Sequence, residues 1–138
     1  MVVEEIMTEA PVCAQSSTSI QSVIATLFEQ EIRHVPIVDG HLLVGIVSDR
    51  DLRGFLAPAM LEFEKSGEIR RKLGQPISSV MNTDVVSVTP ETELSEVVDI
   101  LIEEKVGAVP VVRPGTQELV GIVSYVDVLR AAQKTLND

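Results

Sequence analysis

Two serine–aspartate pairs in this sequence have the residue types and the spacing to bind a nucleotide. The pattern Gly-Ile-Val-Ser-x-x-Asp occurs twice, with Ser48 before Asp51 in one copy and Ser124 before Asp127 in the other. At each serine an apolar strand is predicted to run into a helix, whose unpaired N–H groups and positive dipole end attract an anion. The serine hydroxyl adds a donor for phosphate, and the aspartate can accept hydrogen bonds from both hydroxyls of a ribose. The pairs therefore favour nucleotide binding.

The same residues also have a purely structural interpretation. Serine at the N-cap and aspartate in the first turn form a variant of the capping box, which stabilises a helix start by ~1 kcal/mol without any ligand. A single copy would be interpreted in this way. The duplication, with the same Gly-Ile-Val strand before each serine, favours binding, and both interpretations stay open at this point.

The two patterns belong to a repeat that covers most of the chain. Met7-Thr8 matches Met81-Asn82, and the run from Val35 to Val38 matches the run from Val109 to Val112. Apolar residues at helical and strand spacing predict the order β-α-β-β-α in each copy. The predicted helices are 20–28, 49–55, 94–102 and 125–133, and the predicted strands are 12–14, 34–38, 42–47, 85–88, 108–112 and 119–123. Neither repeat could cover its own sheet, so we expect an α/β (α+β) fold in which two repeats pack with pseudo-twofold symmetry as one compact module.

Local signals refine this organisation. We expect repeats at 4–56 and 77–133, joined by a helical linker at 57–76 that contains a connector helix over 59–73. Thr18 with Gln21 predicts a capping box for the first helix, and Thr92 suits the start of its counterpart. Pro36 and Pro110 lie inside strand runs, and because proline cannot donate to a ladder, each should face an open sheet edge.

The composition excludes several other classes of protein. The net charge of −10 has the wrong sign for binding nucleic acid or an anionic membrane surface. No apolar run approaches the ~20 residues that span a bilayer, and the acidic N-terminus lacks the basic flank of a secretory signal. Cys13 cannot form an internal disulfide, and with His34 and His41 it gives no metal-ligand spacing. We therefore expect a cytoplasmic protein without a metal, nucleic-acid or membrane partner.

Catalysis is the least favoured function. It would need a nucleophile beside a base, or acids in contrasting environments, and the sequence offers neither. The Ser48 and Asp51 pair recurs in the other repeat, as expected for duplicated binding. We therefore expect no enzymatic activity and no catalytic cofactor.

Taken together, these motifs make the chain similar to a tandem pair of CBS domains, the module named after cystathionine β-synthase and also called a Bateman module. The resemblance spans about residues 4–133 and rests on the Met-Thr and Met-Asn starts, the Val-Pro-Ile-Val and Val-Pro-Val-Val strands, and the two Ser-x-x-Asp turns. It implies that two clefts between the repeats bind adenosine compounds: AMP, ADP, ATP or S-adenosylmethionine. We expect a nucleotide ahead of S-adenosylmethionine.

The resemblance also implies which residues form each cleft. One cleft would combine Ser124 and Asp127 with Thr8, Cys13, Arg33 and His34. The other would combine Ser48 and Asp51 with Asn82, Ser87, Gly107 and Ala108. Arg33 and His34 match Gly107 and Ala108, so we expect the Asp127 cleft to gain two cations and to bind the phosphorylated ligand more tightly.

These inferences predict a regulatory sensor. An adenosine ligand would bridge the repeats, change their relative angle and alter a surface that a separate, unidentified protein recognises. The family also implies a homodimer formed through the apolar helices. The alternative is a ligand-free interaction or dimerisation module, in which the Ser-x-x-Asp turns serve only as helix caps.

Overall fold

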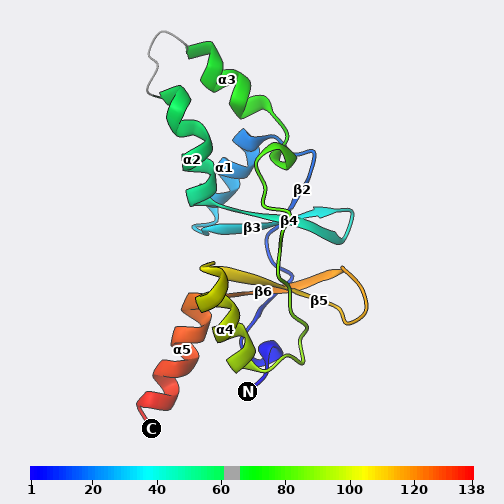
Figure 1. Ribbon diagram of the computed structural model, residues 1–138, viewed down its shortest axis with the longest axis vertical. Helices are drawn as coiled ribbons and strands as arrows, with labels where there is room; N and C mark the ends of the chain where they lie inside the picture. Colours follow the sequence, from blue (N-terminus) through cyan, green and yellow to red (C-terminus); the bar gives the residue numbers. More distant parts are fainter. Residues whose placement is uncertain (61–65) are drawn as a thin grey trace. The chain divides into compact units, whose positions relative to one another are not determined.

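The computed structural model describes residues 1–60 and 66–138 (Figure 1). Within these residues the fold is mixed α/β, with five helices and two three-stranded sheets. The helices are α1 (Ile20–Glu29), α2 (Asp49–Met60), α3 (Ser66–Gly74), α4 (Leu94–Glu104) and α5 (Tyr125–Leu136). The strands are β1 (Thr8–Glu9), β2 (Ala14–Gln15), β3 (His34–Asp39), β4 (Leu42–Ser48), β5 (Ala108–Val112) and β6 (Leu119–Ser124), and the 3-10 turns are η1 (Val3–Glu5) and η3 (Ile77–Ser79).

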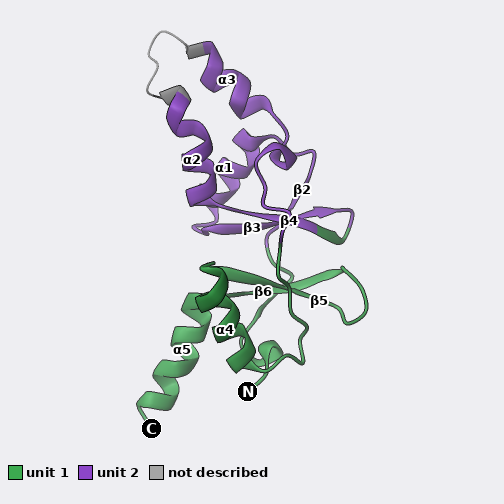
Figure 2. Cartoon of the chain, in the orientation of Figure 1, with its two compact units in different colours: residues 1–11, 41–43, 85–138 green, residues 12–40, 44–84 purple. Residues whose placement is uncertain are grey.

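The chain divides into two compact units that are discontinuous in sequence (Figure 2). Unit 1 contains residues 1–11, 41–43 and 85–138, and unit 2 contains residues 12–40 and 44–84. Each unit therefore combines most of one repeat with the opening segment of the other repeat. The repeat limits 4–56 and 77–133 stay a prediction drawn from the internal matches.

Unit 2 has the sheet order β2-β3-β4. β2 runs parallel to β3, with Ala14 opposite Ile37. The apolar stripe of α1 covers this sheet, because the spacing of its apolar residues gives the helix one buried face. The core contains Ile20, Val23, Leu27, Val35, Ile37, Val47, Leu52 and Ile77. Ile77 comes from η3, so the opening segment of the second repeat completes the core that the first repeat forms.

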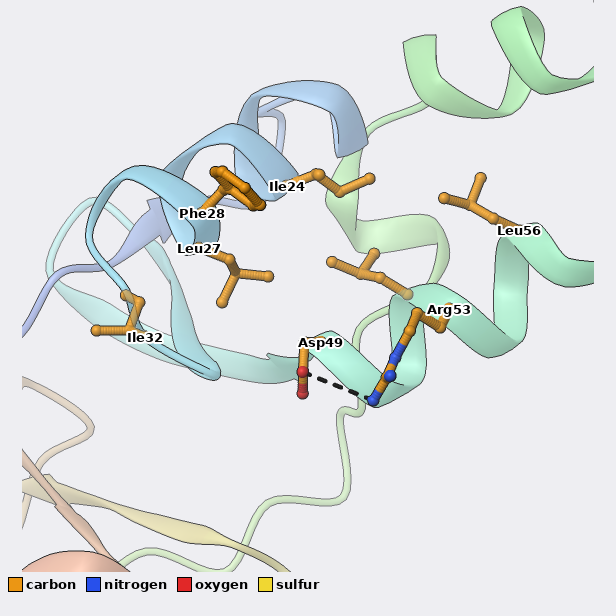
Figure 3. A pocket seen from close by; sticks show the side chains of 8 residues that line it. Ile24, Leu27, Phe28, Ile32, Asp49, Arg53 and Leu56 are labelled. Carbon is orange, nitrogen blue, oxygen red and sulfur yellow. Dashed lines mark ion pairs between the residues drawn. The ribbon is translucent and has the colours of Figure 1, made fainter.

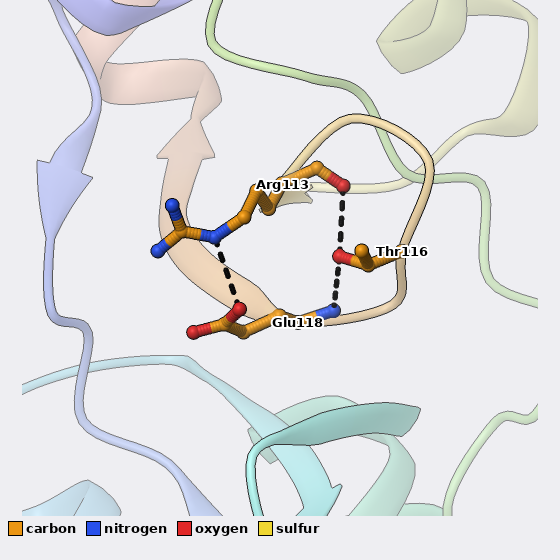
Figure 4. Close-up of polar contacts among 3 residues, drawn as sticks. All are labelled: Arg113, Thr116 and Glu118. Atoms are coloured by element: carbon orange, nitrogen blue, oxygen red, sulfur yellow. Dashed lines mark hydrogen bonds and ion pairs between the residues drawn. The ribbon is translucent and has the colours of Figure 1, made fainter.

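Unit 1 has the sheet order β1-β6-β5, and both strand pairings are antiparallel. Its core contains Val3, Val88, Val97, Val109, Val111 and Val123. The predicted strand at 85–88 is reduced to a parallel bridge between Val88 and Val111. In the turn between β5 and β6, the Arg113 side chain pairs with Glu118 at 3.0 Å, and the Thr116 hydroxyl donates to the Arg113 carbonyl (Figure 4). These contacts close a turn in which Gly115 has a φ of +75°, a value that favours glycine.

The expectation of an open edge is wrong for Pro36, which lies in a central strand, whereas Pro110 lies in an edge strand as expected. Pro36 is buried in β3, the central strand of its sheet, and pairing with β2 begins only at the next residue, Ile37. Pro110 lies in β5. On the outer side of this strand, the Val88 N–H donates to the Pro110 carbonyl at 3.0 Å. Both prolines are tolerated because the neighbouring segment is very short, so no strand pairing requires the backbone N–H that proline lacks.

The two predicted helix caps are wrong by one residue. Ser19, not Thr18, is the N-cap of α1, and its hydroxyl accepts a hydrogen bond from the Ser22 N–H at 3.2 Å. Glu93 occupies the N-cap of α4 without a side-chain cap bond, while the Thr92 hydroxyl accepts from the Thr89 N–H at 3.0 Å. Neighbouring hydroxyl residues compete for a cap, and the backbone path selects one of them.

The linker contains helical residues on both sides of the undescribed stretch. α2 reaches Met60 and α3 begins at Ser66, so the part of the predicted connector helix at 61–65 lies outside the described residues. α3 is held on α2 by Lys72, whose Nζ donates to the Phe55 carbonyl at 2.9 Å and lies 4.8 Å from the Phe55 ring centroid. No helix in the described ranges is long and apolar enough to cross a membrane.

Candidate functional site

The first Ser-x-x-Asp corner lies in unit 2, where β4 ends at Ser48 and α2 begins at Asp49. The Ser48 N–H donates to Asp51 Oδ2 at 3.0 Å, and the Asp51 N–H donates to Ser48 Oγ at 3.1 Å. This reciprocal arrangement satisfies two backbone donors at the helix start. The serine is half-buried and the aspartate is exposed.

The second corner, in unit 1, repeats this geometry where β6 ends at Ser124. The Ser124 N–H donates to Asp127 Oδ2 at 2.8 Å, and the Asp127 N–H donates to Ser124 Oγ at 3.2 Å. Here the serine hydroxyl also donates to Asp127 Oδ2, at 3.1 Å. The predicted capping function is therefore present in both corners. Every bond that an aspartate accepts here uses Oδ2, which leaves the other carboxylate oxygen of each aspartate for a further donor.

Each corner is joined by a residue from the opening segment of the other repeat. The backbone of Asn82 exchanges two hydrogen bonds with Ile46, two residues before Ser48, at 2.9 and 3.0 Å. Thr8 is paired with Ile122, two residues before Ser124. The predicted site residues Ser48, Asp51 and Asn82 thus lie in unit 2, and Ser124, Asp127 and Thr8 lie in unit 1.

The other predicted site residues are divided between the units. Cys13, Arg33 and His34 lie in unit 2, whereas Ser87, Gly107 and Ala108 lie in unit 1. Each predicted cleft therefore draws residues from both units, and the membership of the two clefts stays a prediction. A lone cysteine with no base partner is expected to be a small buried apolar residue, but Cys13 is exposed, because β2, which follows it, is a short edge strand.

Arg33 and His34 lie at the corner of their own repeat. The Asp49 N–H donates to the Arg33 carbonyl at 3.0 Å, which fixes this segment beside the first turn of α2. Burial lowers the pKa of His34 below its usual value of 6.5, and the charge of Arg33 adds to this effect, while Asp49 and Asp51 oppose it. The sequence interpretation did not identify Asp49 as a neighbour of His34. The hairpin signal could have done so, because an antiparallel pair places the start of one strand beside the end of the next.

The matching segment in unit 1 has the same backbone geometry with different side chains. The Tyr125 N–H donates to the Gly107 carbonyl at 3.0 Å, and Ala108 lies opposite Ser124 in the β5–β6 ladder. The second corner therefore has a small, uncharged segment in the position that Arg33 and His34 occupy in the first.

A separate apolar groove of about 260 Å³ lies between α1 and α2 of unit 2 (Figure 3). An ion pair of 3.7 Å between Arg53 and Asp49 borders it, and Phe28 on its wall is 85% exposed. The lining residues are Ile24, Leu27, Phe28, Ile32, Asp49, Leu52, Arg53 and Leu56. The groove offers apolar contact and few hydrogen-bond donors, which suits another apolar surface better than a phosphate.

The described residues contain no cluster of three or more His, Cys, Asp or Glu side chains that could hold a metal ion. The groups that the two corners present are backbone N–H groups, serine hydroxyls, carboxylate oxygens and, at the first corner, the Arg33 guanidinium.

Comparison with known proteins agrees with the internal repeat. The model of the CBS domain family matches residues 3–58 and 77–134. A 33.4 kDa protein in the ribosomal RNA operon of Thermofilum pendens is 32% identical over 114 residues, which cover 79% of this chain but only 38% of that protein. The chain therefore spans less than half the length of this curated relative.

Two similar solved structures contain adenosine compounds. The CBS domain pair of protein MJ0100, in complex with 5′-methylthioadenosine and S-adenosyl-L-methionine, has a TM-score of 0.82 and 26% identity, with 98% of both chains covered. CBSX2 in complex with AMP has a TM-score of 0.79 and 28% identity, with 97% of both chains covered.

Proposed function

The chain belongs to the CBS domain family as a tandem pair, and from this premise we propose that it is a regulatory module that senses an adenosine compound. The observation that carries the proposal is the duplicated corner, in which a serine hydroxyl, a helix N-terminus and an aspartate lie together in both units. Anions are stabilised at such helix starts, and a carboxylate suits ribose hydroxyls. The adenosine compounds bound by MJ0100 and CBSX2 support this ligand class.

The proposed ligands are AMP, ADP and ATP, with S-adenosylmethionine as a further member of the class. Binding would involve residues of both repeats and change their relative geometry. A ligand can shift that equilibrium only by the difference between its affinities for the two arrangements. The resulting change would be recognised by a separate protein, and the chain itself would be a cytoplasmic, non-catalytic homodimer.

A thermal melting screen tests ligand binding directly. A ligand that binds only the folded chain adds ~2.7 kcal/mol at a hundredfold excess over its dissociation constant, which raises the melting temperature by several degrees. We expect this shift with at least one of AMP, ADP, ATP and S-adenosylmethionine, and none with GMP as the control. Mass spectrometry of small molecules released from the denatured protein identifies a ligand that is retained during purification.

A second candidate function is supported by the satisfied capping boxes and by the apolar groove beside Phe28. The chain would then be an interaction module whose corners only cap helices. This function predicts no melting shift with any adenosine compound, together with a dimer in light scattering that Phe28→Glu converts to a monomer. A ligand-dependent melting shift would rule out the caps-only function.

A further inference from the structure

The two corners share their serine and aspartate but differ at the positions that flank them. Around Ser48 and Asp51 the flanking residues are charged or titratable, whereas their counterparts around Ser124 and Asp127 are not charged. The matched residues, first corner before second, are Arg33 and Gly107, His34 and Ala108, Asp49 and Tyr125, Arg50 and Val126, and Arg53 and Leu129. The same binding pair is thus set in two different electrostatic environments.

At the first corner the hydrogen bond from the Asp49 N–H to the Arg33 carbonyl holds Arg33 and His34 beside the start of α2. Asp49 forms an ion pair with Arg53 at 3.7 Å, which offsets one of the two carboxylates near His34. The Arg33 side chain is exposed and forms no ion pair with any described residue, so its charge is available to an incoming anion.

The two serine hydroxyls differ in whether their proton already has an acceptor within the corner. Ser124 Oγ donates to Asp127 Oδ2 at 3.1 Å, so its proton is used within the corner. Among the described residues no acceptor is recorded for the Ser48 hydroxyl, which leaves this proton for a ligand oxygen. The first corner therefore offers a free hydroxyl donor and, in the segment before its hairpin, a cation, whereas the matching positions of the second corner offer neither; the cation of unit 1 that is nearest in sequence, Arg130, lies one turn further along α5.

The surface around the second corner is apolar. Tyr125 is 41% exposed, Val126 is 37% exposed and Leu129 is 60% exposed. A phosphate here would lose hydration against apolar groups and would lie near the Asp127 carboxylate without a matched cation, and both effects oppose binding. An uncharged nucleoside needs only acceptors for its ribose hydroxyls and an apolar surface for its base.

We propose that the Ser48–Asp51 corner binds the phosphate-bearing adenosine ligand, and that the Ser124–Asp127 corner binds an uncharged adenosine nucleoside. The proposal rests on the proposed adenosine-binding function and adds the charge class that each corner accepts. It assigns Arg33 and His34 to the corner of their own repeat, whereas the sequence alone led us to expect them to serve Asp127.

Calorimetric titration of AMP and of adenosine into the full chain tests this division. The variants are Asp51→Asn and Asp127→Asn, because an amide keeps an oxygen to accept the serine N–H while losing the carboxylate charge. We expect Asp51→Asn to weaken AMP binding by about tenfold or more and to spare the tight adenosine site. We expect Asp127→Asn to do the reverse, with melting temperatures confirming that both variants fold.

Arg33→Ala, combined with each of these variants, shows which corner the cation serves. We expect it to weaken AMP binding in the Asp127→Asn background and to have little further effect in the Asp51→Asn background. Arg70→Ala, which removes an exposed cation from α3, is the matched control and should leave both ligands unaffected.

The opposite pattern would overturn the division while keeping the proposed function. That pattern is a loss of AMP affinity from Arg33→Ala in the Asp51→Asn background but not in the Asp127→Asn background. Equal weakening of both ligands by both aspartate variants would overturn it as well. If the unaltered chain binds neither AMP nor adenosine nor any other adenosine compound, the proposed function itself fails.

Discussion

Met81 lies against the backbone of Gly45, so that a Cβ atom at Gly45 would be 2.6 Å from the Met81 sulfur and 3.1 Å from the Asn82 carbonyl oxygen. Met7 has the same relationship with Gly121, at 2.7 Å from its sulfur. Each methionine lies in the opening segment of one repeat and packs on a strand of the other. The glycine that opens each Gly-Ile-Val-Ser-x-x-Asp pattern therefore admits a neighbouring segment, and it lies three residues before the serine of the corner.

Gly45→Ala should consequently destabilise the chain. The methionine side chain can move away, but the Asn82 carbonyl belongs to a paired backbone, so we expect a loss of ~1–3 kcal/mol in the free energy of unfolding. Urea denaturation measures this loss. Gly54→Ala is the matched control: nothing lies within 4 Å of its added Cβ, and alanine in a helix interior should stabilise α2 by ~0.5–1 kcal/mol. Equal effects of the two substitutions would contradict the close approach at Gly45.

The cap of α1 gives a second prediction. Ser19→Ala removes the acceptor for the Ser22 N–H and should cost ~1 kcal/mol of stability. Thr18→Ala should cost less, because only the backbone of Thr18 takes part in recorded hydrogen bonds, to Ile77 and Gln15. Chemical denaturation of the two variants compares them directly. A larger loss for Thr18→Ala would show that Thr18 is the N-cap of α1, as the sequence alone suggested.

The repeat, the order of elements and the two corners could be predicted from the sequence because each has a local signal. Apolar periodicity predicts α1 and α4, and Ser-x-x-Asp predicts the caps of α2 and α5. The exchange of Val3 and Ile77 between the cores has no such signal, because a buried residue in a short turn does not indicate which core it enters. The closeness of Asp49 to His34 is different, because the short connection between β3 and β4 is a local signal from which their pairing could have been predicted.

His34 should make stability depend on pH. Burial lowers its pKa in the folded chain, so the unfolded chain binds a proton first as the pH falls below about 6.5. The stabilisation is therefore complete above that pH and is lost as the pH falls toward the lower folded-state pKa. We expect His34→Gln to become progressively more stable relative to the unaltered chain between about pH 7.5 and pH 5.5.

Denaturant unfolding at several pH values measures this difference, and subtraction cancels the carboxylates that titrate in both proteins. His41→Gln is the control, because this exposed histidine lies in a hairpin turn and its replacement keeps His34 in place. A constant difference between His34→Gln and the unaltered chain across the pH range would show that His34 is not held in its neutral form by burial.

The exchanged core residues give the last prediction. Ile77 is fully buried in the core of unit 2 although it lies in the opening segment of the second repeat. Ile77→Ala should cost ~2–5 kcal/mol through lost burial and a residual cavity. Ser78→Ala, an exposed position in the same turn, should cost little.

Hydrogen exchange followed by mass spectrometry locates the effect. We expect Ile77→Ala to reduce protection in α1 and β3 of unit 2 more than in α4 and β5 of unit 1, because cavity effects act first on the packed neighbours. Val3→Ala should show the reverse pattern, since Val3 is buried with Val97 and Val109 in unit 1. The exchange of core residues would be contradicted if Ile77→Ala reduced protection only in the second repeat and Val3→Ala only in the first.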